Sequence, residues 1–174
     1  MTSVFSSSRS ARARVLTLTL ALVVAALSLL SSSPARADGS EGGDDGSAVQ
    51  QIVAAQLEEH SGGTVVGNEI RYDGGVTFVA VPDGVFSLAQ CTSGRFCGWS
   101  SPNYSGSFYW VTGSGTKSLS WTAASYSNKR SGIARLYNAG GTASLCFAPG
   151  RSRSTVGASY HNPDKVTLGS VTSC

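Results

Sequence analysis

Apolar residues follow three different patterns along this chain, and each pattern predicts a different kind of element. The first is one continuous apolar run, Val15 to Leu30. The second lies between Ser47 and Gly63, where apolar positions recur at helical spacing. The third is a series of short β-rich runs separated by turn residues, from Glu69 to the end of the chain. The patterns divide the chain into a leader, a small helix-and-hairpin segment and a β domain.

The first 37 residues are organised like a secretory signal peptide. Three arginines precede the apolar run, and Ala35-Arg36-Ala37 has the small-x-small form that signal peptidase recognises. The apolar run is shorter than the roughly 20 residues that a membrane-spanning helix needs, although an anchor is the alternative interpretation. We therefore predict a secreted, extracellular protein, cleaved after Ala37, with no membrane attachment once the signal is removed.

Residues 47–63 predict one amphipathic helix. Ser47 opens it with a capping box completed by Gln50, and Gly62-Gly63 is typical of a helix C-cap. The apolar face consists of Val49, Ile52, Val53 and Leu57. Residues 38–46 contain only glycine, serine and acidic residues, so we predict a flexible acidic leader there.

A β-hairpin should follow the helix and complete a segment that spans residues 47–84. Glu69–Tyr72 and Val76–Val81 are β-rich runs on either side of Asp73-Gly74-Gly75, a strong turn signal. A helix on a two-stranded hairpin is too small a core to be stable alone. We expect this segment either to pack on the next domain or to act as a pro-region.

Residues 85–174 predict a β sandwich, so the fold class is mainly β. This part of the chain is rich in serine and glycine and has no helical period. The predicted strands are Arg95–Ser100, Ser107–Thr112, Ile133–Asn138, Ala143–Ala148 and Val166–Val171.

Removal of the signal peptide changes the net charge of the protein. The full chain of 174 residues carries +3, but four of its 13 basic residues lie in residues 1–37. The rest divides into −8 over residues 38–83 and +7 over residues 84–174. A nearly neutral mature chain gives no reason to expect a nucleic-acid partner. The polarity suggests that the acidic segment covers the basic domain until secretion or processing is complete.

All four cysteines lie in the β domain, and an even count in an exported chain favours disulfides. Three pairings are possible. A Cys91–Cys97 bridge closes a short local loop and leaves Cys146 to pair with Cys174, which is the pairing that we expect. Zinc is not expected, because CxxC spacing is absent.

The cysteine-rich opening resembles a known family. The sequence CTSGRFCGW, residues 91–99, resembles the start of the small secreted bacterial metalloproteinase inhibitors that are built on a βγ-crystallin fold. Four residues after Trp99 comes Tyr104-Ser105-Gly106, which is similar to the aromatic, gap and Tyr-x-Gly signature of that fold. The glycine of this corner needs a backbone conformation closed to residues with a Cβ. Residues 125–132 resemble the end of the first Greek key, whereas the second key lacks the signature.

The resemblance implies a double Greek-key sandwich that acts as a monomeric inhibitor of an extracellular, thermolysin-like peptidase. Such an inhibitor presents a rigid, substrate-like bond. Together with the preference of these peptidases for a bulky apolar side chain after the scissile bond, the resemblance points to the bond between Cys146 and Phe147. An equally weighted alternative makes Phe147 a buried strand residue and Cys146 only a disulfide partner.

Calcium motifs of the βγ-crystallin type are degenerate in this chain. The first counterpart retains Asn128 and Ser131, and the second retains Asp164 and Thr167. Calcium takes six to eight oxygen ligands, and neighbouring lysines and arginines would repel it. We therefore expect neither calcium nor any other cofactor.

Enzyme motifs are absent from the sequence, so we predict that the protein is not an enzyme. Two alternatives to an inhibitor stay open. One is a binding or toxin module whose tryptophans and tyrosines form a face for cell-wall or anionic surface polymers. The other is a structural crystallin-like domain that has lost its calcium sites.

Overall fold

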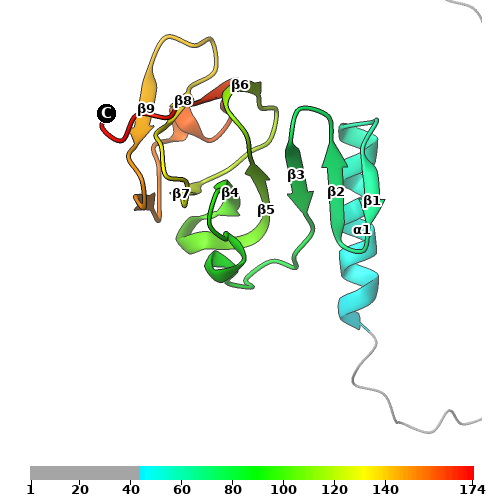
Figure 1. Cartoon of the computed structure of the whole chain (residues 1–174). Helices are drawn as coiled ribbons and strands as arrows, with labels where there is room; N and C mark the ends of the chain where they lie inside the picture. Colours follow the sequence, from blue (N-terminus) through cyan, green and yellow to red (C-terminus); the bar gives the residue numbers. More distant parts are fainter. Residues whose placement is uncertain (1–43) are drawn as a thin grey trace, which may run out of the picture. The chain divides into compact units, whose positions relative to one another are not determined.

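The computed structural model describes residues 44–174 of the chain (Figure 1). The predicted signal peptide, residues 1–37, and residues 38–43 of the predicted leader lie outside the described residues. The described part contains one α-helix and two antiparallel sheets, which confirms the predicted mainly-β class. No helix within it is long and apolar enough to span a membrane.

Helix α1 runs from Asp44 to Glu59 and therefore begins earlier than predicted. Ser47 lies inside it, so residues 44–46 of the predicted leader are helical rather than flexible. Acidic residue types suit the first turn, where the helix dipole favours negative charge. The end agrees with the sequence, since Gly62 follows the helix with a φ of 90°. Val53 is buried, as the predicted apolar face requires.

The larger sheet has seven strands in the order β1-β2-β3-β5-β4-β7-β10. In that order they are Thr64–Val66, Glu69–Tyr72, Val76–Val79, Ser105–Val111, Phe96–Ser101, Ser125–Asn128 and Ser152–Arg153. The smaller sheet has the order β6-β11-β8-β9, formed by Gly115–Ser118, Lys165–Leu168, Ala134–Tyr137 and Ser144–Phe147. Short 3-10 turns η1, η2 and η3 occupy Leu88–Gln90, Pro102–Tyr104 and Ala158–Tyr160.

The two sheets are interlocked by an exchange of strands. Strands β4 to β7 form one consecutive set and β8 to β11 another, and each set places its third strand in the other set's sheet. Thus β6 pairs with β11, and β10 pairs with β7. The orders β5-β4-β7-β10 and β9-β8-β11-β6 are equivalent by position. This arrangement is consistent with the predicted pair of Greek keys.

Every strand predicted from the sequence is present, but four strands were not predicted. The missed strands are β1, β6, β7 and β10. Three of them read GTKS, SYSN and SR, without the alternation of apolar and polar residues that marks a half-buried strand. Their backbone pairing partners come from distant parts of the chain, which the local pattern does not reveal.

The predicted hairpin is present as β2 and β3, and it extends the larger sheet. Strand β3 pairs with β5 over four residue pairs, from Val76 opposite Val111 to Val79 opposite Phe108. All four residues of β3 are buried. The described part has two ion pairs, His60–Glu59 and Arg71–Glu69, and neither reaches the basic domain. Backbone pairing and apolar burial therefore hold the acidic segment, and no ion pair supports the charge-cover hypothesis.

The inner face of the larger sheet is covered partly by the smaller sheet and partly by α1. One buried cluster joins Val53 of α1, Phe78 of β3, Tyr109 of β5 and Leu136 of β8. A second cluster on the outer face joins Val79 and Val81 to Trp99 and to the Cys91–Cys97 disulfide. Because residues of the helix-and-hairpin segment belong to both clusters, the segment and the β domain share one core.

We predict that deleting residues 44–81 will sharply lower the yield of folded, soluble protein. The deletion exposes the edge of β5 and the apolar side chains of both clusters, and an unpaired edge promotes aggregation. Yield and far-UV circular dichroism measure the effect, with deletion of residues 38–43 as the control. A truncated chain that is fully folded would instead identify the segment as a removable pro-region.

Candidate functional site

The candidate inhibitory site lies where the chain crosses from one sheet to the other. We call residues Ser144–Arg153 the rim segment: strand β9, a turn, and strand β10. Strand β9 is an edge of the smaller sheet and β10 is an edge of the larger one. The equivalent of β9 in the larger sheet is β5, whose outer side is covered by β3. Within residues 44–174, strand β9 has no strand on its outer side, so it can accept another extended chain.

Asn128, which is completely buried, fixes the turn of the rim segment from the core side. Its Nδ2 donates hydrogen bonds to the carbonyl oxygens of Phe147 at 2.8 Å and Ala148 at 3.2 Å. Its backbone N–H donates to the carbonyl of Arg151, and its own carbonyl accepts from Gly150, both at 2.8 Å. One side chain and its peptide groups thus hold four of the five positions from Phe147 to Arg151, which is the rigidity a substrate-like inhibitor needs.

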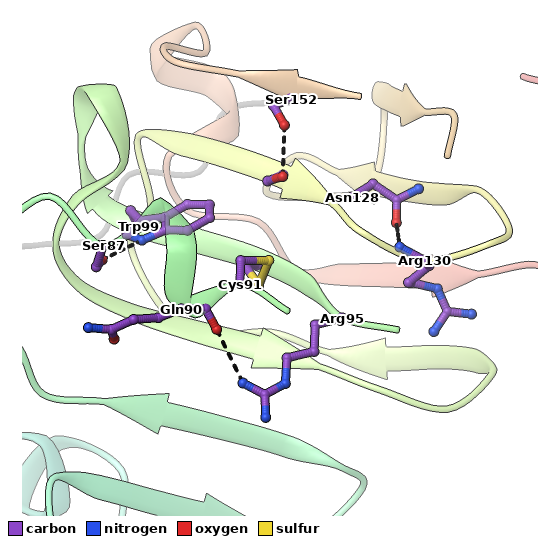
Figure 2. Close-up of a disulfide and its surroundings, with 10 residues drawn as sticks. Ser87, Gln90, Cys91, Arg95, Trp99, Asn128, Arg130 and Ser152 are labelled. Carbon is purple, nitrogen blue, oxygen red and sulfur yellow. Dashed lines mark hydrogen bonds between the residues drawn. A yellow bond between two sulfur atoms is a disulfide. The ribbon is translucent and has the colours of Figure 1, made fainter. Parts of the chain in front are cut away.

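Asn128 is itself held by the turn that follows it. Its Nδ2 also donates to the carbonyl of Gly132 at 2.9 Å, and its Oδ1 accepts from the backbone N–H of Arg130 at 3.2 Å (Figure 2). Burial lowers the pKa of the Arg130 guanidinium. That group still donates to the carbonyl of Gly113 at 2.6 Å. The sequence around Asn128 indicates only a remnant calcium ligand and has no local signal for this role.

The two disulfides have the expected pairing and hold different parts of the domain. Cys146 of β9 is bonded to Cys174, with 5.9 Å between the Cα atoms, so the chain end is tied to the rim segment. Cys91 is bonded to Cys97 and is buried beside Trp99 (Figure 2). The described residues contain no free cysteine. The first disulfide belongs to the candidate site and the second to the core behind it.

Phe147 does not present its side chain as the predicted reactive bond requires, and this expectation is corrected. Its exposed fraction is 1%. The ring packs against Phe96 and Tyr126, with centroid distances of 5.5 and 5.9 Å. Side chains alternate along a strand, so Cys146 points outward while Phe147 points into the core. The alternative interpretation, a buried strand residue, describes the structure.

Residues of the predicted aromatic corner lie together. Trp99 is fully buried and donates its indole N–H to the hydroxyl of Ser87 at 2.7 Å (Figure 2). Its ring meets Tyr104 edge-on at 5.2 Å. Gly106 has a φ of 75°, and a Cβ there would lie 2.5 Å from Ser100 Oγ. The aromatic corner therefore stabilises the β4–β5 connection, and the contacts of Trp99 are structural.

Oxygen atoms of the remnant calcium motifs are largely engaged in protein contacts. Asp164 Oδ2 accepts a hydrogen bond from the backbone N–H of Gly140 at 2.6 Å. Thr167 Oγ1 lies 2.9 Å from Thr116 Oγ1. Ser131 is exposed. Residues 44–174 contain no cluster of three His, Cys, Asp or Glu side chains that could hold a metal ion.

Two buried tyrosines lie beneath the site and titrate far from their usual range. The hydroxyl of Tyr126 donates to the carbonyl of Tyr160 at 2.9 Å. Burial raises the pKa of Tyr126 well above its ordinary value. Burial also raises the pKa of Tyr109, and the neighbouring Tyr126 adds to that shift.

Comparison with known protein families identifies the inhibitor segment. The model of peptidase inhibitor family I36 matches residues 86–147, from the strand-like segment before η1 to the end of β9. Over this stretch, about a third of the chain, the protein is similar to peptidase inhibitor family I36. The I36 match confirms the metalloproteinase inhibitor family that the cysteine-rich opening resembles, and it makes peptidase inhibition, not catalysis, the general function. No curated protein matches the chain. No solved structure matches it either, so the βγ-crystallin relationship of the I36 domain stays a prediction.

We predict that Phe147→Ala will lower the free energy of unfolding by about 3–5 kcal/mol, because it empties a site in the aromatic core. Phe86→Ala is the matched control, since Phe86 is 62% exposed and should change stability little. Urea denaturation measures both. A Phe147→Ala variant of normal stability that has lost inhibition would restore the anchor role of this side chain.

We also predict alkaline unfolding. The raised pKa values of Tyr109 and Tyr126 stabilise the folded state fully below pH about 10, where both states are protonated. Above that pH the unfolded chain releases these protons more readily, so the free energy of unfolding should fall as the pH rises. Urea denaturation over this range should show a shallower fall for Tyr126→Phe than for the wild type. Equal slopes would contradict the assignment.

Proposed function

We propose that this protein is secreted and, as a monomer, blocks an extracellular thermolysin-like metallopeptidase with its rim segment. The observation that carries the proposal is that β9, an edge strand of its sheet, continues into a turn that is fixed by Asn128 and flanked by the Cys146–Cys174 disulfide. Peptidases bind substrates as extended chains, and an edge strand offers backbone groups of that form. A chain that is already rigid loses little conformational entropy on binding.

Backbone and half-buried side chains make the contact in this proposal, rather than the Phe147 side chain. The Cys146–Phe147 bond lies within the edge strand, but its cleavage would require Phe147 to leave the core. Leu145 points to the core like Phe147, since the two residues share one face of β9, and it packs against the buried cluster. Ala148 directly follows β9 and is half-buried. It is an apolar side chain of the rim segment that a pocket selective for apolar residues could reach.

Charge around the rim segment supports an acidic partner surface. Arg151 and Arg153 are exposed, and Arg135 of β8 lies opposite Cys146. Asp164 is the one acidic residue among the last 91 residues of the sequence. Such charges mainly raise the association rate and make it dependent on ionic strength.

Burial of the aromatic residues disfavours the polymer-binding alternative. Trp99 and Trp121 are buried, and Trp110 is covered by the guanidinium of Arg95, 4.0 Å from its ring centre. A sugar-binding face needs exposed rings, and these side chains instead form core contacts.

Titration of the mature protein, residues 38–174, against thermolysin with a peptide substrate tests the proposed target. We expect stoichiometric loss of activity that weakens with added salt, and a serine peptidase in the same assay controls for selectivity. Absence of inhibition at micromolar excess would exclude this target class. Mass spectrometry of long incubations maps any cleaved bond: a cut outside residues 144–153 with retained inhibition would remove the rim segment from the proposal.

Asn128→Ala tests whether rigidity makes the rim segment an inhibitor. We expect this variant to be cleaved in the rim segment and to lose inhibition with time, because the carbonyls of the turn lose their shared donor. Asn162→Ala is the control, since Asn162 is exposed and accepts one hydrogen bond, from Thr122.

A further inference from the structure

A groove separate from the rim segment runs along helix α1. Its volume is about 630 Å³. Helix α1 lines it from Ala48 to Glu59, a length of about 16 Å at the helical rise. Phe78 and Tyr109 on the inner face of the larger sheet also line it.

Small residues keep the groove open. Ala48 and Ala55 of α1 line it where longer side chains would fill it. Gly98 of β4 is another lining residue, and a Cβ there would lie 2.7 Å from the Tyr109 ring. Apolar side chains form a large part of the lining. The volume of the groove is in the range of small-molecule binding sites.

Two buried N–H groups on residues that line the groove have no hydrogen-bond partner among the described residues: Gln56 Nε2 and Trp121 Nε1. His60 Nε2 lies 3.6 Å from a carboxylate oxygen of Glu59. Gln56 and Trp121 are 8% and 9% exposed. The rings of His60 and Trp121 lie 5.4 Å apart, so Trp121 lies at the end of the groove where helix α1 finishes. Buried donors without partners are costly, which indicates an acceptor that occupies this end.

The charges that line the groove restrict which kind of acceptor can bind there. Glu59 lines the end that holds His60, and Asp83 also belongs to the lining, whereas no lysine or arginine does. Two carboxylates without a counter-charge repel a carboxylate, sulfate or phosphate ligand. The acceptor should therefore be an uncharged oxygen, such as that of an amide, ester or ketone.

We propose that this groove binds a small uncharged molecule with a flat apolar body and a carbonyl oxygen that accepts hydrogen bonds from Trp121 and its neighbours. The apolar body would lie against Ala55, Phe78 and Tyr109. This site does not depend on the rim segment, so it is independent of the proposed inhibitory function.

Three probes with one ring and different polar groups test the proposal: benzamide, benzoate and benzylamine. The readout is the indole N–H resonances of the three tryptophans in 15N-labelled mature protein, with that of Trp121 assigned through Trp121→Phe. We expect benzamide to shift the Trp121 resonance in a saturable way, and benzoate and benzylamine to leave it unchanged. The Trp99 resonance, whose N–H is bonded to Ser87, should stay in place and reports that the protein is folded.

Ala55→Leu should fill the groove and weaken benzamide binding by roughly tenfold or more. Ala54→Leu is the matched control, because Ala54 is an exposed neighbour on the same helix and does not line the groove. The proposal is overturned if benzamide leaves Trp121 unchanged, if benzoate or benzylamine binds as well as benzamide, or if both leucine variants behave alike. Binding can be abolished with inhibition intact, so the two proposals can fail separately.

Discussion

The crossing of the chain between the two sheets imposes the constraint on which this structure depends. Strand β10 belongs to the larger sheet although its neighbours in sequence belong to the smaller one, so the chain must turn at the rim. That turn directs the carbonyls of Phe147 and Ala148 inward, where they need donors. Asn128 supplies them from a fully buried position. The same hydrogen bonds close the fold and make the proposed inhibitory segment rigid.

The helix-and-hairpin segment removes the pseudo-symmetry of the two sheets. Strands β5 and β9 hold equivalent positions, but β3 covers the outer side of β5 while β9 remains an edge. One domain of this kind would otherwise present two comparable edges to other chains. The segment thus covers β5 and leaves β9, the edge in our proposed inhibitory site, without a strand on its outer side among residues 44–174.

The same segment creates a surface that the I36 domain alone would lack. Helix α1 covers only part of the inner face beside the smaller sheet, and the groove lies along it, partly lined by Trp121. The rim segment and the groove differ in whether their buried polar groups have hydrogen-bond partners. The buried side-chain amide of Asn128 is paired with backbone carbonyls, whereas Gln56 Nε2 and Trp121 Nε1, on residues that line the groove, have no hydrogen-bond partner among residues 44–174. The first pattern holds a loop in one conformation, and the second is typical of a binding site.

Sequence alone determined the elements whose signal is local. The helix, the hairpin across Asp73-Gly74-Gly75, five strands of the β domain and the resemblance to the inhibitor family all follow from neighbouring residues or from short motifs. The sequence left three disulfide pairings possible, and the structure has the expected one. Tertiary structure decided which way Phe147 points, that β3 pairs with β5, and that Asn128 holds the turn of the rim segment. The reason is physical: the burial of a side chain and the partner of a strand edge depend on segments distant in the chain, and no local pattern of apolar and polar residues encodes them.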